Sequence, residues 1–361
     1  MLREKKIMKV LCKSLFVIFC FQFPSCMKDN MRPIHDFNKK GEGVFIVCEG
    51  NFMYGNSSLS YYDKNGKSVE NQVFLKANGI PLGDVAQSLV ILDSTAYIAV
   101  NNDGKIYAIN INTFKLKSKI TNLVSPRYIQ FINYSKGYIT DLYSKNITIF
   151  NPKNMTVTGQ IDIAVASETY YRHSSEQMVF CNDFMFVNSW SYDDKILVIN
   201  TKTDKLTDTI QVLKQPRKIL LDRNKKLWVL CDGGYKNSPY AGKSGIVRIN
   251  TATFEIEKIF EFTEGSSPID MKINNNGDTI YYINNNVYRF QINAETLPTQ
   301  EYITAGTKNF YALGIDPDNS DLYISDAIDY MQSGVVYRYN SDKVCIDRFN
   351  VGVIPNSFVF K

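Results

Sequence analysis

Histidine and paired cysteines are scarce in this sequence. Only two histidines, His35 and His173, occur in 361 residues, and none of the seven cysteines forms a Cys-X-X-Cys pair. Histidine is the side chain most often used for proton transfer, and cysteine frameworks need regular spacings. We therefore expect no catalytic residues, no cofactor and no metal site built on these residue types. The cysteines of the main part of the chain are expected to be mostly buried free thiols: Cys48, Cys181, Cys231 and Cys345.

The N-terminal segment has no apolar run long enough to span a bilayer. Its apolar stretch covers residues 15–23, whereas a membrane helix needs about 20 residues. A basic segment precedes this stretch and Pro-Ser-Cys follows it, as in a bacterial lipoprotein signal peptide. We expect three parts in the chain: a lipoprotein signal peptide over residues 1–25, a flexible tether over residues 26–40 that starts at a lipidated Cys26, and a folded domain over residues 41–361.

The basic balance of the chain is confined to the expected signal peptide. The formal net charge is +5, and the first 25 residues hold five Lys or Arg and one Glu. The rest of the chain is therefore almost neutral. Nucleic-acid binding needs a basic patch or stripe. We expect no nucleic-acid partner.

The sequence shows no helical period, but it does show a repeat. In each repeat a short apolar strand ends in Asn or Asp, a polar turn follows, and another strand begins about six residues later. Two further strands, joined by a tight Asp/Asn turn, precede each of these anchor residues. Four short strands in roughly 40–50 residues are typical of a β-propeller blade. The anchors recur at intervals of 41–50 residues: Asp63, Asn110, Asn151, Asn200, Asn250, Asn293 and Asn340.

The two ends of the repeat array complement each other. The segment 43–50 matches the second strand of a repeat and lacks a first, whereas 355–361 matches a first strand and lacks a second. Joining them completes one blade and removes exposed sheet edges. We expect an all-β fold: a seven-bladed β-propeller of four-stranded blades, closed by the C-terminal strand within the first blade. The strands of each blade are named A to D in chain order.

This pattern resembles the YncE-like, surface-layer-type seven-bladed propellers, and especially the propeller lipoproteins of Bacteroidota outer membranes. The resemblance covers essentially all of the chain after Cys26, but it rests on degenerate repeats. The tract 27–30, Met-Lys-Asp-Asn, is similar to the export signal that sends such lipoproteins to the outer face. The group includes BtuG-type lipoproteins that capture cobalamin and pass it to a TonB-dependent transporter. The resemblance implies a surface-exposed, lipid-anchored outer-membrane protein that binds a corrinoid and has a transporter as its partner.

A phosphate-binding motif is suggested by Gly242-Lys243-Ser244, but its context is wrong. A P-loop needs Gly where the chain has Asn237, and it needs a helix after the motif. The residues that follow alternate between strand and turn. We expect this segment to be a loop between strands, without a bound nucleotide.

Acidic residues offer two possible cation sites. The loop 316–321, Asp-Pro-Asp-Asn-Ser-Asp, looks like a calcium loop, although it stands where other repeats have an Asp/Asn-capped turn, which is the favoured interpretation. Propeller lactonases bind a metal with Glu, Asn and Asp side chains that face the channel. Here the alternative is that such residues solvate the channel and cap turns. The candidates follow the B strands or end them: Glu49, Asp141, Asn188, Asp232 and Asp326.

Aromatic residues gather in the B–C loops, which open on the same face of a propeller as the D–A loops. These loops are expected to be short in blades two, three and six and long in blades one, four, five and seven. Exposed aromatic side chains on long loops are typical of binding surfaces, although some could pack on their own loops. The predicted rim consists of Phe52, Tyr54, Trp190, Tyr192, Tyr235, Tyr240 and Tyr330.

The D–A connections add a second set of candidate ligand-binding residues. Arg127 and Arg217 each follow a proline at equivalent positions, and paired guanidinium groups suit an acidic or phosphate-bearing ligand. They could instead form structural ion pairs with Asp141 or Asp326. The other D–A loops contribute Tyr171, Arg172 and Tyr311.

Three functions remain open at this point. A binding protein for a small-molecule ligand, such as a corrinoid, is the favoured one. A protein- or glycan-binding adhesion module would use the same aromatic rim, and a metal-dependent lactonase-like hydrolase would use the channel carboxylates.

Overall fold

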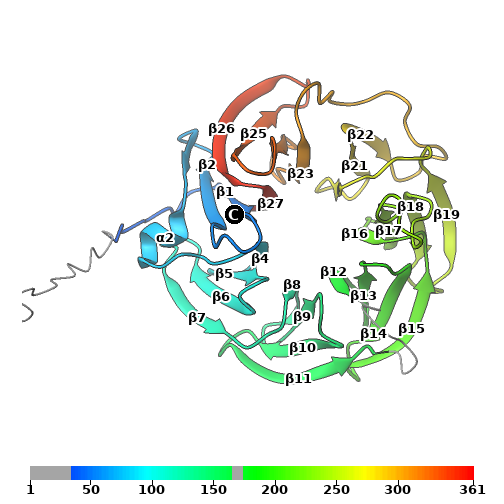
Figure 1. Ribbon diagram of the computed structural model, residues 1–361, viewed down its shortest axis with the longest axis horizontal. Coiled ribbons are helices and arrows are strands. Elements are labelled where there is room, and N and C mark those ends of the chain that lie inside the picture. The colour runs from blue at the N-terminus through cyan, green and yellow to red at the C-terminus, as the bar shows by residue number, and fades with distance from the viewer. Residues whose placement is uncertain (1–33, 165–173) are drawn as a thin grey trace, which may run out of the picture. The chain divides into compact units, whose positions relative to one another are not determined.

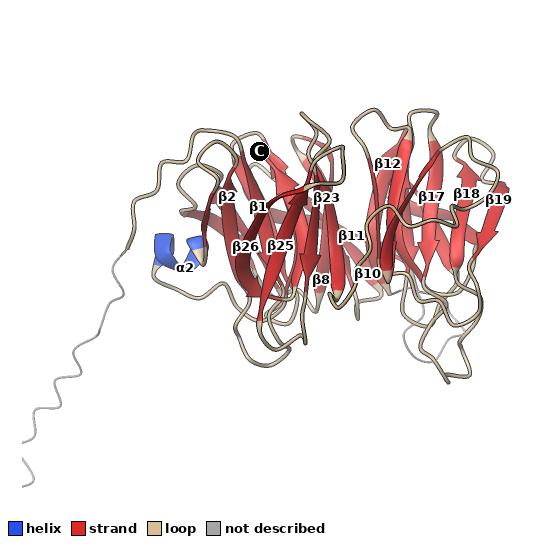
Figure 2. Ribbon diagram, turned by 90° about the horizontal axis from the view of Figure 1, so that it is seen from above, coloured by secondary structure: helices blue, strands red, loops and turns tan. Residues whose placement is uncertain are grey.

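The computed structural model describes residues 34–164 and 174–361. Seven antiparallel sheets are arranged in a ring around a central channel (Figure 1). The seven-bladed propeller predicted from the repeats is confirmed. Seen from the side, the strands run across the thickness of the ring and the loops gather at its two ends (Figure 2).

The blades follow one another in chain order. Blade one has β27(Pro355–Phe360), β1(Gly43–Cys48), β2(Ser58–Asp63) and β3(Ser68–Glu70). Blade two has β4(Ala86–Leu92), β5(Thr95–Val100), β6(Lys105–Asn110) and β7(Leu116–Ile120). Blade three has β8(Pro126–Asn133), β9(Lys136–Asp141), β10(Asn146–Asn151) and β11(Thr156–Asp162). Blade four has β12(Ser175–Cys181), β13(Phe184–Ser189), β14(Lys195–Asn200) and β15(Lys205–Gln211).

Blades five to seven complete the ring. Blade five has β16(Pro216–Leu221), β17(Lys226–Cys231), β18(Gly245–Asn250) and β19(Ile256–Glu261). Blade six has β20(Asp270–Ile273), β21(Thr279–Asn284) and β22(Asn286–Gln291). Blade seven has β23(Phe310–Ile315), β24(Leu322–Asp326), β25(Ser333–Tyr339) and β26(Cys345–Val353).

Blade one closes the ring as the sequence predicts. β27, from the C-terminal end of the chain, pairs antiparallel with β1, and the order in this sheet is β27-β1-β2-β3. Blade six departs from the common pattern at its outer edge. Its D position has no full strand; instead, Val287 forms a single bridge with Ile303.

The recurring anchor residues are explained by the turns between strands C and D. The side-chain oxygen of Asn200 accepts hydrogen bonds from the backbone N–H groups of Lys202 and Thr203, at 3.0 and 3.2 Å. Such a bond lets a short polar side chain fix a turn locally. The bond from the backbone N–H two residues later is also accepted by the anchors of five other blades: Asp63, Asn110, Asn151, Asn250 and Asn340. Asn293, in blade six, lies two residues beyond the end of β22.

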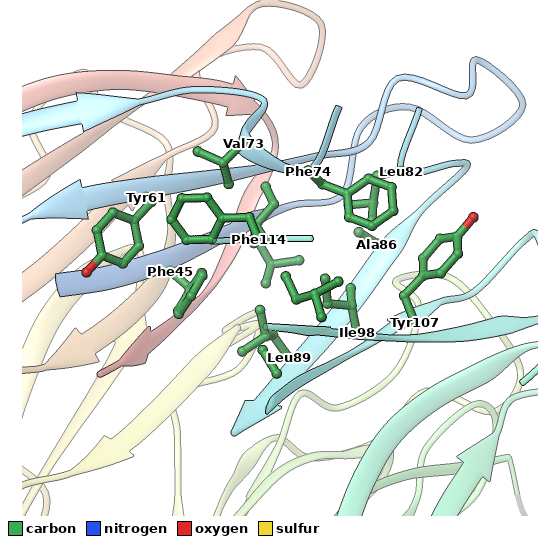
Figure 3. Close-up of a cluster of buried hydrophobic side chains, with 14 of the residues drawn as sticks. Phe45, Tyr61, Val73, Phe74, Leu82, Ala86, Leu89, Ile98, Tyr107 and Phe114 are labelled. Atoms are coloured by element: carbon green, nitrogen blue, oxygen red, sulfur yellow. The ribbon is translucent and has the colours of Figure 1, made fainter. Parts of the chain in front are cut away.

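The hydrophobic core lies between neighbouring blades. In the cluster between blades one and two, Phe114 is completely buried and stands edge-on to Phe45 and Phe37, with ring centroids 5.7 and 5.1 Å apart (Figure 3). Phe114 belongs to a C–D turn and has a left-handed backbone, φ 58°. The turn therefore directs an aromatic side chain back into the space between blades. The short helix α2(Val73–Asn78), which the strand pattern did not predict, covers this cluster with Val73 and Phe74.

Residues 34–40, the described part of the expected tether, form no helix or strand but contact blades one and two. The backbone N–H of His35 donates to the carbonyl of Lys76, and that of Lys39 donates to the carbonyl of Asn112. Cys26 and the expected signal peptide lie outside the described residues. No helix among the described residues is both long and apolar enough to cross a membrane.

The cysteines match the expectation. Cys48, Cys181, Cys231 and Cys345 are free thiols, and all but Cys345 are buried. Burial raises the pKa of Cys48 to about 12, so this thiol stays protonated and unreactive at neutral pH.

Candidate functional site

The B–C and D–A loops surround one mouth of the central channel. As predicted, the B–C loops of blades one, five and seven are long, but that of blade four, residues 190–194, is only one residue longer than those of blades two and three. Blade five has the longest, between Cys231 and Gly245, whereas blade six has only Asn285 between its two strands. The rim of this face is therefore uneven, with its lowest point at blade six.

A cavity of about 510 Å³ lies at this mouth and is called the mouth cavity below. Each blade contributes to its wall the side chain that stands at the start of its innermost strand. Pockets of this size hold small-molecule ligands in other proteins. The seven wall residues are Asn356, Gln87, Arg127, Glu176, Arg217, Ile269 and Tyr311, in blade order.

The wall residues are exposed to the cavity because the inner strands bulge there. In blade two, Ala86 pairs with Val100 and Ser88 with Ala99, so Gln87 has no partner opposite it. A bulge of this kind bends the strand and re-aims a side chain. The register shifts at the same level in the inner strands of blades one, three, four, five and seven.

Bulging leaves backbone groups of the inner strands unpaired, and the neighbouring blades satisfy them. Ser88 Oγ donates to the carbonyl of Arg127 at 2.6 Å, which links blade two to blade three. Hydrogen bonds at or beside the inner strands also cross the remaining six blade borders, so that the bonds complete a closed circle. They are Asn356 Nδ2 to Gln87 O, Ser175 Oγ to Asp141 O, Ile219 N to Gln177 Oε1, Arg217 Nε to Ile269 O, Leu313 N to Asp270 Oδ2, and Ser325 Oγ to Pro355 O.

The two arginines of the D–A connections both line the mouth cavity. Arg127 Nε donates to Glu176 Oε1 at 2.7 Å, and Arg217 Nη1 lies 3.4 Å from Asp232 Oδ2. Ion pairs are therefore present, but with Glu176 and Asp232 rather than with Asp141 and Asp326. Burial lowers the pKa of Arg217, yet Tyr311 and Asp232 more than offset this, so its pKa lies above the ordinary value and the guanidinium stays charged.

The opposite side of the mouth cavity carries an acceptor. Glu49, directly after β1, accepts hydrogen bonds from Asn356 Nδ2 at 2.8 Å and from the hydroxyl of Tyr311 at 3.3 Å. Burial, and after it the charge of Glu49, hold the pKa of Tyr311 well above its usual range. The phenol therefore keeps its proton and acts as a donor.

The aromatic residues of blades four and five form one cluster beside the cavity. Tyr192 contacts both Tyr235 and Tyr240, with ring centroids 5.3 and 5.5 Å apart, and Trp190 meets Tyr235 edge-on. Arg217 lies over the ring of Trp190, 6.0 Å from its centroid. Trp190 and Tyr235 line the mouth cavity, while Tyr192 and Tyr240 stand farther out.

Blades one and seven supply the other predicted aromatics. Phe52 lines the mouth cavity, and both Phe52 and Tyr54 are exposed, by 63% and 69%. Tyr330 packs edge-on against Tyr311 at 5.8 Å. Tyr171 and Arg172 lie outside the described residues. The structure thus brings together Phe52, Arg127, Trp190, Arg217, Tyr235 and Tyr311 around one cavity.

The carboxylates at the ends of the B strands mainly hold loops in place. Asp141 accepts the backbone N–H groups of Ser125, Tyr143 and Ser144, and Asp326 accepts those of Asn309 and Ile328. Among the described residues there is no group of three or more His, Cys, Asp or Glu side chains placed to hold a metal ion. Their capping role explains why these acidic residues recur at one end of the sheets.

The acidic loop 316–321 already contains a cation. The ammonium group of Lys64 lies 2.9 Å from Asp316 and 2.8 Å from Asp318. Asp316 also accepts the backbone N–H of Asp318, as in the turns of other blades. Lys64 thus lies where a cation between Asp316 and Asp318 would be, Arg338 pairs with Asp321, and the turn interpretation fits the contacts.

The Gly-Lys-Ser segment is also accounted for. Lys243 pairs with Glu261 at 2.7 Å, and Ser244 Oγ donates to the carbonyl of Ser266. The segment leads directly into β18 rather than into a helix. It forms the end of the longest B–C loop, as predicted.

Several wall residues were not predicted from the sequence. Gln87, Glu176, Asn356, Tyr128 and Lys218 line the cavity beside the two predicted arginines. A usable signal was present, because Ser-Pro-Arg, Gln-Pro-Arg and Ile-Pro-Asn recur at the start of inner strands. This motif marks the ring positions Arg127, Arg217 and Asn356, but Gln87, Glu176 and Tyr311 do not follow a proline.

Solved structures with the same architecture have low sequence identity to this chain. A quinonprotein alcohol dehydrogenase-like protein from Bacteroides thetaiotaomicron has a TM-score of 0.66 at 16% identity, over 90% of this chain and 79% of that one. The dihydro-heme d1 dehydrogenase NirN, solved with DHE, has a TM-score of 0.63 at 8% identity, over 91% and 77%. A streptogramin B lyase has a TM-score of 0.56 at 14% identity, over 80% and 93%. At these identities the likeness concerns the fold alone.

No curated protein matches the sequence significantly. One family model does, the domain of unknown function DUF5074, and the match runs from residue 42 to residue 353. That range takes in all the strands of the seven blades except β27, and it begins after the expected tether. The chain belongs to the DUF5074 family.

Proposed function

We propose that this protein is a binding protein, which takes up a small-molecule ligand at the mouth cavity and carries out no chemistry on it. The observation that supports this most is the ring of seven side chains at the starts of the inner strands, six of them at bulges, on the floor of an aromatic rim. A channel wall needs polar side chains only for hydration and for the links between blades. In this protein, charged side chains and aromatic rings also line the channel wall at the mouth cavity.

The wall has hydrogen-bond donors to spare. An arginine has five N–H groups. Arg127 uses Nε for Glu176, and Arg217 uses Nε for Ile269 and Nη1 for Asp232, with no further hydrogen bond among the described residues. A ligand rich in acceptors, such as carboxylate, phosphate or amide oxygens, suits these donors.

The resemblance noted above makes a corrinoid the first ligand to test. In this proposal the protein is anchored in the outer membrane through lipid on Cys26, faces the outside of the cell, and passes its ligand to a TonB-dependent transporter. A corrinoid carries amide side chains that would meet Gln87, Asn356 and the arginines, while its macrocycle would lie against Phe52, Trp190 and Tyr235 at the rim.

Tryptophan fluorescence provides a direct test. Trp190 lines the mouth cavity, whereas Trp228 is completely buried. Titration with cyanocobalamin should quench the emission of Trp190 and raise the melting temperature, and Trp190→Phe should lose most of the quenching. Absence of both changes at saturating concentration would exclude a corrinoid as the ligand. Labelling with a fatty-acid probe, lost in Cys26→Ala, would test the anchor.

A protein-binding role is the second candidate, and one observation favours it. In the B–C loop of blade one, Phe52, Met53 and Tyr54 are exposed by 63%, 78% and 69%. Three adjacent exposed apolar side chains suit a protein contact. A pull-down with the purified domain, in which Met53→Asp abolishes capture of a specific protein while ligand binding is unchanged, would separate the two roles.

A further inference from the structure

A second cavity of about 510 Å³ lies next to the mouth cavity, over blade six, and is called the side groove below. Ile269 lines both cavities, so the two spaces adjoin at this residue. The polar residues of the groove are Glu264, Ser266, Ser267, Asn284, Asn285 and Asn309, with Tyr330 on the side of blade seven.

The side groove is open because the B–C connection of blade six is shorter than those of its neighbours. Its B–C connection is the single residue Asn285, whose left-handed backbone, φ 62°, makes the tightest turn of the ring. The neighbouring blades rise higher, with B–C loops over residues 232–244 and 327–332. The rim of the mouth cavity is therefore open on one side.

The wall on the side of blade seven is fixed by hydrogen bonds. Asn51 Nδ2 donates to the carbonyl of Tyr330 at 2.6 Å, which ties this loop to blade one. The hydroxyl of Tyr330 donates to Asn309 Oδ1 at 3.4 Å, and Asn309 Nδ2 donates to the carbonyl of Ile328. Tyr330 is thus held with one face available, 43% of its surface being exposed.

The chemistry of the groove suits hydroxyl groups better than a peptide backbone. Of the residues that line the groove, only Asn284 at the end of β21 and Phe310 at the start of β23 belong to strands, so no run of strand backbone faces it. A peptide could not bind there by adding a strand. Side-chain amides and serine hydroxyls both donate and accept hydrogen bonds, and the carboxylate of Glu264 accepts them, so the groove can satisfy both the O–H and the oxygen of a sugar hydroxyl.

From this geometry we infer that the ligand is a short oligosaccharide with a uronic acid unit at one end. The uronic acid unit lies in the mouth cavity, where its carboxylate meets Arg127 and Arg217. The next units are neutral, because Glu264 is the only charged residue that lines the side groove, and they leave through it between Asn285 and Tyr330. The inference rests on the proposed capture function and names, for the same site, a ligand class that competes with the corrinoid.

Galacturonic acid, alone and extended by one, two or three galactose units, tests the inference by calorimetry. Affinity should rise about 10-fold from the monomer to the trimer, as the side groove fills, and level off beyond it; a tenfold gain corresponds to about 1.4 kcal/mol. The matching galactose oligomers lack the carboxylate and should bind at least about 10-fold more weakly, because the two arginines lose their partner.

A variant with a bulky side chain in the side groove tests the role of the groove, and a second variant elsewhere serves as its matched control. Ser267→Trp should abolish the gain with chain length while leaving monomer binding unchanged, since Ser267 lines only the side groove. Ser341→Trp, at an equally exposed C–D turn of blade seven, should behave like the unaltered protein. Equal affinity for monomer and trimer would overturn the role of the groove. Binding of cyanocobalamin without binding of any galacturonate would overturn the ligand class but not the capture function. Failure of both ligands would count against both.

Discussion

The two ends of the propeller are built on different rules. At the A–B and C–D end, the turns are short, and six of the seven C–D turns are fixed by an Asn or Asp that bonds its own backbone. At the B–C and D–A end, the B–C loops range from one residue, Asn285, to the long loop 232–244, and the D–A segment 71–85 contains helix α2. The regular turns thus lie at the end whose anchor residues stabilise the fold, and the irregular loops lie at the end where we propose that the ligand binds.

Exposed aromatics follow the same division. Most large exposed rings, including Phe52, Tyr54, Tyr192, Tyr240 and Tyr330, belong to the B–C loops. Tyr134 is an exception, in the A–B turn of blade three, exposed by 57% and close to Asp93. The comparison predicts that substitutions at the repetitive end change stability, that substitutions at the irregular end change binding, and that the shared inner wall affects both.

The largest effect is expected at the inner wall. Asp270 is 1% exposed, accepts the backbone N–H of Leu313, and lies 3.4 Å from Lys218 and 3.9 Å from Lys272. Asp270→Asn leaves two partly buried ammonium groups without their carboxylate and should lower the free energy of unfolding by about 3 kcal/mol. Chemical denaturation of both proteins measures this difference in the free energy of unfolding. Asp208→Asn, on the exposed face of β15, is the control; a loss below about 1 kcal/mol for Asp270→Asn would contradict the role assigned here.

Acid should remove the same contribution. Burial raises the pKa of Asp270, but Lys218, Lys272 and two backbone N–H groups more than offset this, so its pKa is lowered from 3.8. A carboxylate with a lowered pKa stabilises the fold above its unfolded-state value and loses that contribution as pH falls through the folded value. Unfolding curves at decreasing pH below 3.8 should show the unaltered protein and Asp270→Asn converging. A constant difference between them would mean that the charge of Asp270 is not responsible.

A smaller effect is expected at the repetitive end. Asn200→Ala removes two hydrogen bonds of a C–D turn, to Lys202 and Thr203, and should cost about 1–2 kcal/mol of unfolding free energy. Ligand affinity should not change, because the turn lies at the far end of blade four. Thr203→Ala, exposed in the same turn, should stay within about 0.5 kcal/mol. Weaker ligand binding by Asn200→Ala would show that the two ends are not independent.

The smallest effect on stability is expected at the aromatic rim. Tyr240 is 58% exposed and contacts Tyr192, so Tyr240→Ala should change the unfolding free energy by less than about 0.5 kcal/mol. It should nevertheless weaken ligand binding, measured by titration of Trp190 fluorescence. Tyr134→Ala, equally exposed at the opposite end, should alter neither quantity. Equal binding by both variants would place the ligand away from the rim.

The blades could be predicted because their signals are local. An anchor such as Asn200 caps a turn within its own repeat, and the Asn or Asp at that position is visible in the sequence. Loop lengths could also be predicted, since they are the spacings between recognisable strands. The closure of blade one followed from the complementary ends.

The inner wall could not be predicted, because it depends on neighbouring blades. Glu176 is the partner of Arg127 only because blades three and four stand side by side, and the two residues are 49 positions apart. Asn356 lies at the mouth because β27 bulges against β1, a feature of pairing rather than of composition. The missing D strand of blade six has a similar origin, since the bridge between Val287 and Ile303 replaces a full strand.

The insertion of β27 beside β1 gives the array no terminal blade. In an open solenoid the end repeats have one neighbour each, and they need polar caps. In this ring every blade has two neighbours, and the circle of hydrogen bonds along the inner strands crosses every blade border. No terminal blade is therefore present that could unfold before the others. We expect the propeller to unfold in a single cooperative transition rather than blade by blade.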